Sequence, residues 1–339
     1  MTRRELVIEA LEHRATDIVP YHLEFTQQAL ESMIEYTGDP NIESKLGTCL
    51  HYCQFWGWPT EIPEKPGYFR DIYGVEWNRN GVDKDIGLPD EYLIEDLEEC
   101  DYEFPEVDEA RLRAEYEQLI ATKEDKFCFV GFGFVMFERL WSLLGMENAL
   151  MSMVACPEEL DAFMQKIGDH YLKLLDIALE YDIDAVYFGD DWGMQKGLIM
   201  GPDHWRRFIK PQMARLYAKI KAAGKYVIQH SCGDCHEVLG DLVEIGLDCY
   251  QTFQPEVYDI VGIKAKYGDR LAFWGAVSTQ VCLPFTDPEG VRKECKRVTD
   301  ILRKDGGFII GPTHAMTHDI PPENILALAE VFHNQEKYL

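Results

Sequence analysis

The fold is indicated most clearly by the stretch Tyr226-Val227-Ile228-Gln229-His230-Ser231-Cys232-Gly233-Asp234-Cys235, in which a short apolar run ends directly in polar residues. Five similar apolar runs occur from residue 127 onward, and most of them are followed by Gly. They cover residues 127–130, 185–188, 247–250, 271–274 and 308–310. Segments with helical spacing of apolar residues separate the runs, and this alternation predicts repeated β/α units around a parallel sheet.

The length of the chain favours one elaborated domain over two. We expect an α/β fold, a (β/α)8 TIM-type barrel, over residues 1–339, because single barrels commonly reach this size. An opening helix over about 2–13 precedes a first strand over 18–23, which gives seven predicted strands and leaves the eighth unassigned. Residues from about 35 to 120 do not follow the repeat. They are interpreted as an N-terminal insertion over the barrel mouth, with 68–72 and 74–78 as a hairpin.

The charge of the chain excludes two classes of partner. With 60 acidic and 33 basic residues, the net charge of -27 repels nucleic acid and anionic membrane surfaces. No apolar stretch is long enough for a signal peptide or a membrane helix, so the protein is expected in the cytoplasm. In that reducing compartment the ten cysteines are expected to be thiols or metal ligands. The oligomeric state is not predicted.

Imidazole and thiolate groups follow two of the predicted strands. His230 and Cys232 come at the end of one strand, and His314 follows the last one. Barrel enzymes keep their chemistry at the carboxyl ends of their strands, so these three side chains can meet a single ion there. Three N/S ligands suit zinc and leave one coordination position open. From the short spacing alone, a strand-capping His230 and a buried Cys232 are equally acceptable.

Three other residues compete as ligands. Cys235 forms a C-x-x-C pair with Cys232 and is the first alternative to His314. His236 and His318 are expected to face solvent or to support the ligands. The sequence therefore leaves the third ligand open between His314 and Cys235.

A further polar group follows the strand at 185–188. Asp190 and Asp191 are candidate catalytic residues, because paired carboxylates can hold different pKa values and share acid and base roles. The alternative is that at least one of them binds backbone amides. Trp192 is a candidate ligand-binding wall, although a packing role is the commoner one. Gly131 and Gly133 lack dinucleotide-binding spacing and are expected to allow a close approach of backbone to ligand.

Several motifs resemble the uroporphyrinogen decarboxylase superfamily, in the family's order and over almost the whole chain. They are residues 1–6 with 17–20, residues 71–77, the segment from Gly189 to Pro202, residues 230–233 and residues 321–324. The resemblance implies a barrel enzyme of one of two kinds. One is a metal-free porphyrinogen decarboxylase, and the other is a zinc methyltransferase that works with a corrinoid protein.

The sequence departs from the decarboxylases after the first strand. They carry an arginine-rich motif that binds substrate carboxylates, whereas this chain has His22 and Glu24, which we take as substrate-binding candidates. The methyltransferase branch is favoured by His230-x-Cys232, which matches its zinc motif. Those enzymes usually take a cysteine as third ligand, near the place that His314 occupies here.

The resemblance thus implies transfer of a methyl group between a small methylated compound and a corrinoid. The compound could be a methoxy compound, as in O-demethylation, a methylamine or a thiol. Ile228 occupies the first position of the cobalamin-binding D-x-H-x-x-G pattern, so the corrinoid is expected on a separate protein. A decarboxylase and a non-catalytic metal-binding or corrinoid-protein-binding module remain the alternatives.

Overall fold

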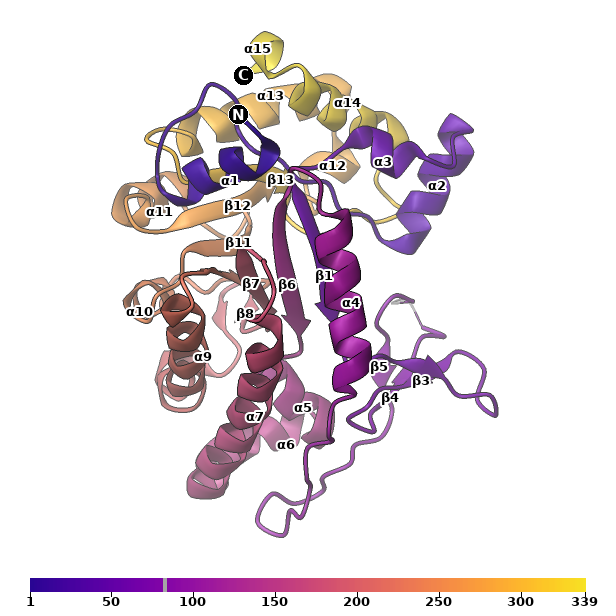
Figure 1. Cartoon of the computed structure of the whole chain (residues 1–339), viewed down its shortest axis with the longest axis vertical. Helices are drawn as coiled ribbons and strands as arrows, with labels where there is room; N and C mark the ends of the chain where they lie inside the picture. Colours follow the sequence, from indigo (N-terminus) through magenta and orange to yellow (C-terminus); the bar gives the residue numbers. More distant parts are fainter. Residues whose placement is uncertain (82–83) are drawn as a thin grey trace.

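The computed structural model describes residues 1–81 and 84–339 of the chain. At its centre is a curled, seven-stranded parallel sheet in the order β1-β6-β7-β10-β11-β12-β13 (Figure 1). The strands are β1 (Leu50–Phe55), β6 (Phe127–Gly133), β7 (Ala185–Gly189), β10 (Tyr226–His230), β11 (Cys249–Phe253), β12 (Ala272–Val277) and β13 (Phe308–Pro312). Helices flank this sheet, as the burial of parallel strands on both faces requires.

A short N-terminal segment closes the sheet into a barrel. Tyr21 forms a parallel bridge with Ile310 of β13. The Ile310 amide donates to the Pro20 carbonyl at 2.9 Å, and the Cys49 amide donates to the Tyr21 carbonyl at 2.9 Å. The segment therefore lies between β13 and the start of β1. The prediction of a TIM-type barrel is confirmed.

The eighth strand, which the sequence did not reveal, is β1. It lies inside the segment expected to be an insertion, as does α4 (Glu109–Thr122), so the boundaries of 35–120 were too wide. Between β1 and α4 lies a four-stranded sheet of β2 (Thr60–Glu61), β3 (Tyr68–Arg70), β4 (Glu76–Asn78) and β5 (Leu88–Pro89). Its β3–β4 pair is the expected antiparallel hairpin. Residues 82 and 83 of the expected insertion lie outside the described residues.

The small sheet lies toward the end of the barrel to which the arrowheads of β1 and β6 point (Figure 1). This is the end where the candidate site residues are found. A second short hairpin, β8 (Gly193–Met194) with β9 (Gly197–Leu198), follows β7 at the same end.

The remaining helices alternate with the strands. They are α1 (Arg3–Leu11), α2 (Gln27–Thr37), α3 (Ile42–Leu46), α5 (Phe137–Leu144), α6 (Met146–Ala155), α7 (Pro157–Ala178), α8 (Gly201–His204), the π-helical turn η1 (Trp205–Ile209), α9 (Lys210–Ala222), α10 (Leu239–Glu244), α11 (Ile260–Tyr267), α12 (Cys282–Phe285), α13 (Pro288–Leu302), α14 (Pro322–His333) and α15 (Gln335–Tyr338). The opening helix begins with a capping box, in which the side chains of Thr2 and Glu5 each accept the other's backbone amide.

The core consists of two shells. The barrel interior is filled by a cluster to which most strands contribute alternate residues: Leu50, Phe127, Phe129, Ala185, Tyr187, Ile228, Cys249, Ala272, Trp274 and Ile309. The opposite faces of the strands pack against the helices. All ten cysteines fall in the described part of the chain and are free thiols. Within that part, no helix is both long and apolar enough to cross a bilayer.

Candidate metal and catalytic site

The first two candidate ligands lie where β10 reaches the barrel mouth. Ile228 faces the barrel interior, and strand alternation turns His230 to the same side, one layer nearer the mouth. Cys232 follows in the loop after the strand, with its Sγ 3.6 Å from the Nε2 atom of His230. The sequence placed both residues at this strand end, and both lie there.

His314 brings the third donor atom from β13. It lies two residues after the end of that strand, and its ring centroid is 5.7 Å from that of His230. One ligand atom from each of His230, Cys232 and His314 lies within 4.8 Å of the other two.

This donor set fits zinc in its chemistry and in the spacing of its His230–Cys232 pair. A tetrahedral ion with bonds of about 2.0–2.3 Å holds its ligand atoms roughly 3.3–3.8 Å apart. The 3.6 Å between Cys232 Sγ and His230 Nε2 falls within that range. Two imidazoles and one thiolate are preferred zinc donors, and a three-residue set leaves a fourth position for a substrate.

Two residues behind His230 fix the orientation of its ring. The Nδ1 atom of His230 is hydrogen-bonded to Oε1 of Gln251, and the Tyr187 hydroxyl donates to the same oxygen at 3.2 Å. Since that oxygen can only accept, the proton of a neutral His230 belongs on Nδ1, and Nε2 keeps its lone pair for a metal. Gln251 is buried in β11, opposite His230 in the sheet register.

Asp191 provides a negative charge beside the ligands. Its Oδ1 accepts the Cys232 amide at 2.8 Å and lies 3.3 Å from Nε2 of His230. Burial acts to raise the pKa of this carboxyl, but a protonated His230, through its hydrogen bond and its charge, lowers it to about 2. Asp191 therefore stays ionised at neutral pH.

The candidate ligands shift one another's pKa values. Burial and the charge of Asp191 act to raise the pKa of the Cys232 thiol, but His230 and His314 outweigh them and the pKa is lowered. Burial acts to lower the pKa of His314, but Cys232 raises it. A thiolate next to imidazole is the state of Cys232 that binds metal.

Asp190 has a different environment from its neighbour. Its two carboxylate oxygens accept the amides of Phe137 at 3.0 Å and Glu138 at 2.8 Å, which are the first two residues of α5. The Trp192 indole donates to the same carboxylate. These are the contacts of a carboxylate that caps a helix N-terminus. Burial nevertheless raises the pKa of Asp190 to about 6, against the effect of the backbone amides. A catalytic role for Asp190 stays a prediction.

The predicted substrate-binding residues differ in their surroundings and in how far they are buried. His22 is buried in the barrel, where its Nδ1 is 2.6 Å from the Thr48 hydroxyl, and burial lowers its pKa to about 4. Glu24 is partly exposed and accepts the Tyr52 hydroxyl at 3.2 Å. Trp192 is fully buried and packs edge-on against Trp205, 5.3 Å between centroids. Contact of these three with a ligand stays a prediction.

The rival ligands lie outside the cluster. Cys235 is fully buried, 3.3 Å from the Ser231 hydroxyl, and burial raises its pKa to about 12. The ring of His236 is paired with Asp234 at 2.7 Å, and His318 is exposed. The three rivals Cys235, His236 and His318 thus take no part in the three-residue group.

One partly buried carboxyl near the ligands was not anticipated. Glu138 follows the β6 loop in the first turn of α5. Burial, and then the charges of Asp191 and Asp190, raise the pKa of its carboxyl well above the usual value. No local sequence signal marks Glu138, because a glutamate at a helix start is ordinary. Gln251 and Tyr187 were missed for the same reason, since both look like plain strand residues.

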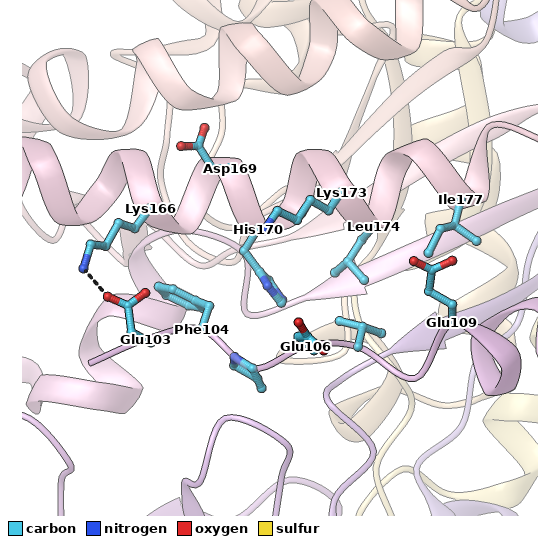
Figure 2. A pocket seen from close by; sticks show the side chains of 12 residues that line it. Glu103, Phe104, Glu106, Glu109, Lys166, Asp169, His170, Lys173, Leu174 and Ile177 are labelled. Atoms are coloured by element: carbon cyan, nitrogen blue, oxygen red, sulfur yellow. Dashed lines mark hydrogen bonds and ion pairs between the residues drawn. The ribbon is translucent and has the colours of Figure 1, made fainter. Parts of the chain in front are cut away.

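A cavity of about 450 Å³ lies away from this site. Figure 2 shows it between α7, which contributes Lys166, His170 and Lys173, and the segment of residues 103–109. Lys166 and Glu103 form an ion pair across it at 3.2 Å. Its lining comes from α7 and residues 103–109 and includes none of the candidate ligands, so this cavity is separate from the group at the mouth.

A family model and several curated proteins that resemble this chain in sequence all carry the same family name. The family model described as uroporphyrinogen decarboxylase (URO-D) matches residues 91–335. The uroporphyrinogen decarboxylases of Vesicomyosocius okutanii subsp. Calyptogena okutanii and Oceanobacillus iheyensis are 23% and 25% identical to this chain over 194 and 185 residues. Each alignment covers 53% of this chain and 50% of the relative, so the chain spans about half the length of the curated relatives it matches.

A solved structure extends the likeness to the whole chain. A methyltransferase from Methanosarcina mazei superposes over 100% of both chains with a TM-score of 0.71, at 17% sequence identity. At that identity the likeness shows a shared fold.

Proposed function

The chain belongs to the uroporphyrinogen decarboxylase family, and we propose that within it this protein is a zinc-dependent methyltransferase that moves a methyl group between a small methylated compound and a corrinoid. The corrinoid would be carried by a separate protein, and the reaction would take place in the cytoplasm. The observation that carries the proposal is the meeting of two imidazoles and one thiol within 4.8 Å at the barrel mouth. Such a donor set has no evident use in a metal-free decarboxylation.

The charge around the cluster also supports methyl transfer. Glu24 and Asp191 present carboxylates near the ligands. A porphyrinogen carries several carboxylates of its own and would be repelled by them. A neutral methyl ether, a methylamine or a thiol would not.

Zinc at this site would act as a Lewis acid toward the heteroatom that carries the methyl group. The chain's own residues have three tasks around it. Gln251 and Tyr187 hold His230 in the tautomer that keeps Nε2 free. Asp191 fixes the Cys232 loop through the backbone amide. Glu138, whose pKa is raised by burial, is the candidate to hand a proton to the departing heteroatom.

In the direction of corrinoid methylation, the bond between the methyl carbon and the heteroatom breaks, and its electron pair stays on the heteroatom. The new bond forms with the electron pair of the reduced cobalt of the corrinoid. The heteroatom takes up one proton, so electrons and charge balance without a further oxidant or reductant.

Metal analysis combined with a substrate screen tests the proposal. We expect about one zinc per chain, and zinc-dependent change in the visible spectrum of a reduced corrinoid supplied with methoxylated aromatics, methylamines or thiols. Release of carbon dioxide from uroporphyrinogen by metal-free protein would instead establish a decarboxylase. Bound zinc without turnover of any of these compounds would favour a non-catalytic metal-binding protein.

A further inference from the structure

Helix α6 is apolar on its outer side as well as on its inner side. Its buried residues are Ala149, Ser152 and Met153. On the opposite side of the helix, Met151 and Val154 are 56% and 74% exposed. Its one charged residue is Glu147. A helix that is apolar all round is normally buried, so the outer side of α6 has the composition of a surface that another molecule covers.

The exposed apolar surface continues past the start of α6. The ring of Tyr92 is exposed and lies beside Gly145, on which a built Cβ would be 2.9 Å from it. Leu93 is also exposed, and its amide donates to the Leu143 carbonyl at 3.0 Å. Met146 follows Gly145 and is the first residue of the helix. We define the α6 face as the five exposed side chains Tyr92, Leu93, Met146, Met151 and Val154.

The surroundings of the α6 face are acidic. The two stretches that supply it, residues 85–110 and 140–165, contain 12 and 4 acidic residues and no Lys or Arg. Glu91, Glu95 and Glu147 are exposed and lie within two residues of a member of the face. The α6 face therefore combines apolar side chains with an excess of negative charge.

This combination distinguishes between possible occupants. Two copies of the chain that met through this face would bring their acidic surroundings together, and like charges repel. An anionic membrane is repelled in the same way. A surface with Lys and Arg around apolar residues complements both properties of the face.

The α6 face lies at the mouth end of the barrel. The first two amides of α5, the helix before α6, bind the carboxylate of Asp190 directly after β7. Figure 1 shows α5 and α6 beyond the arrowhead of β6. A molecule bound to the face is therefore at the same end of the barrel as the candidate metal ligands.

We propose that the α6 face binds a partner protein through a basic amphipathic helix of that partner. The apolar side of the partner helix packs on Met151 and Val154, and its Lys and Arg side chains face Glu91, Glu95 and Glu147. An apolar stripe on one helix suits a second helix, because their side-chain ridges and grooves interdigitate. This contact needs neither zinc nor methyl transfer, so the inference stands apart from the proposed function.

Fluorescence anisotropy with two labelled synthetic peptides tests the proposal on the full chain. Both peptides form an amphipathic helix with the same leucine stripe, and the polar side carries lysine in one and glutamate in the other. We expect the lysine peptide to bind at least about tenfold more tightly than the glutamate peptide. Added salt should weaken its binding, because exposed charges are screened.

A double variant of α6 separates the face from the general acidity of the chain. Met151→Ser combined with Val154→Ser should weaken binding of the lysine peptide at least about tenfold, because the apolar contact is lost. The melting temperature should stay the same, since both side chains are exposed. Val261→Ser is the matched control, an exposed valine on α11, whose charged residues are Lys264 and Lys266.

A second pair of variants tests the charge around the face. Glu91→Gln combined with Glu147→Gln should weaken binding of the lysine peptide severalfold. Glu35→Gln combined with Glu43→Gln changes the net charge equally at exposed positions on α2 and α3, and should leave the affinity nearly unchanged.

Equal affinity of the wild type and the Met151→Ser, Val154→Ser variant for the lysine peptide would overturn the inference, as would equal binding of the two peptides. A dimer of the full chain that dissociates in this variant, measured by sedimentation, would overturn it in favour of a second copy. Binding to phosphatidylserine vesicles that is lost in the same variant would overturn it in favour of a membrane surface.

Discussion

The carboxylate of Asp71 and the guanidinium of Arg139 form an ion pair from which solvent is excluded. Oδ2 and Nη1 lie 3.3 Å apart, and the two side chains are 0% and 1% exposed. The guanidinium also stacks on the ring of Tyr73, 3.6 Å from the centroid. Asp71 belongs to the segment between β3 and β4, and Arg139 to α5. The pair therefore attaches the small sheet to the helix that carries Glu138.

Removing one partner of this pair should be costly. Arg139→Met leaves the Asp71 charge buried without its counterion, so we expect the free energy of unfolding to fall by about 3–5 kcal/mol. Urea denaturation measures the change. Combined with Asp71→Asn, the loss should be smaller than the sum of the single losses, because the two residues interact directly. Losses below about 1 kcal/mol in each single variant would contradict the importance of the pair.

Stability should fall as the pH drops from about 6.5 toward 4. Burial lowers the pKa of His170 to about 4, with smaller contributions from Arg139 and Lys173. In this window the unfolded chain binds a proton that the folded protein does not, so the free energy of unfolding decreases by up to about 1.4 kcal/mol per pH unit. The buried His22 adds a similar effect.

The variant His170→Gln isolates the contribution of one ring. The amide can still reach the Tyr73 hydroxyl, which is 3.0 Å from His170 Nε2 in the native protein. The stability difference between pH 7 and pH 5 should shrink by about 2 kcal/mol. His318→Gln is the control, since His318 is exposed. An unchanged difference in His170→Gln would show that this histidine is charged in the folded state.

The hydrogen bond between His230 and Gln251 predicts that loss of Gln251 weakens metal binding. Gln251→Leu removes the acceptor for Nδ1 of His230, and losing such a partner typically weakens metal binding about 10–100-fold. Gln251→Glu keeps an acceptor and should retain affinity. Gln335→Leu is a matched control, because this buried glutamine bonds to the backbone of Val19 and to none of the candidate ligands. Competition with a chelator measures the zinc dissociation constants. Equal constants for Gln251→Leu and wild type would show that Gln251 does not strengthen metal binding.

The identity of the third ligand can be tested by ranking two variants. His314→Ala should lower zinc occupancy far more than Cys235→Ser, because His314 lies in the three-residue group and Cys235 is buried beside Ser231. Elemental analysis of freshly purified protein gives the occupancy. The reverse order would mean that the C-x-x-C pair binds the metal.

The two neighbouring aspartates should respond differently to amidation. Asp190→Asn weakens the cap of α5 and is expected to cost about 1 kcal/mol of stability with little change in zinc content. Asp191→Asn removes the charge next to His230 and should slow methyl transfer more than Asp190→Asn does. Initial rates of corrinoid methylation and thermal melting of both variants distinguish a catalytic role from a structural one. A slower Asp190→Asn enzyme of unchanged stability would give the catalytic role to Asp190.

Much of the barrel could be predicted because buried parallel strands are continuous apolar runs. The missing strand, β1, reads Leu50-His51-Tyr52-Cys53-Gln54-Phe55 and has no such run. Only Leu50, Tyr52 and Gln54 face the barrel, and the outer positions pack under α4 with partly polar residues. That pattern is hard to distinguish from the irregular sequence that follows it.

The candidate ligands were predictable for a related reason. Residues at the carboxyl ends of parallel strands converge, whatever their separation in sequence, and this brought His230 together with His314. The supporting residues depend instead on register between strands. Gln251 acts on His230 because β10 and β11 place them opposite each other, which no local pattern encodes.

The closure of the barrel by the segment around Tyr21 has a consequence for how the chain folds during synthesis. Val19 exchanges backbone hydrogen bonds with the side chain of Gln335, 316 residues away, and Tyr21 bridges to Ile310. At about 5–20 residues per second, the ribosome needs roughly 15–60 seconds to produce these partners. Throughout that time the segment around Tyr21, which lies beside β1, lacks its partner β13 and presents an open edge, the kind of surface on which nascent chains aggregate. The first half of the barrel therefore stays prone to aggregation until the last strand arrives.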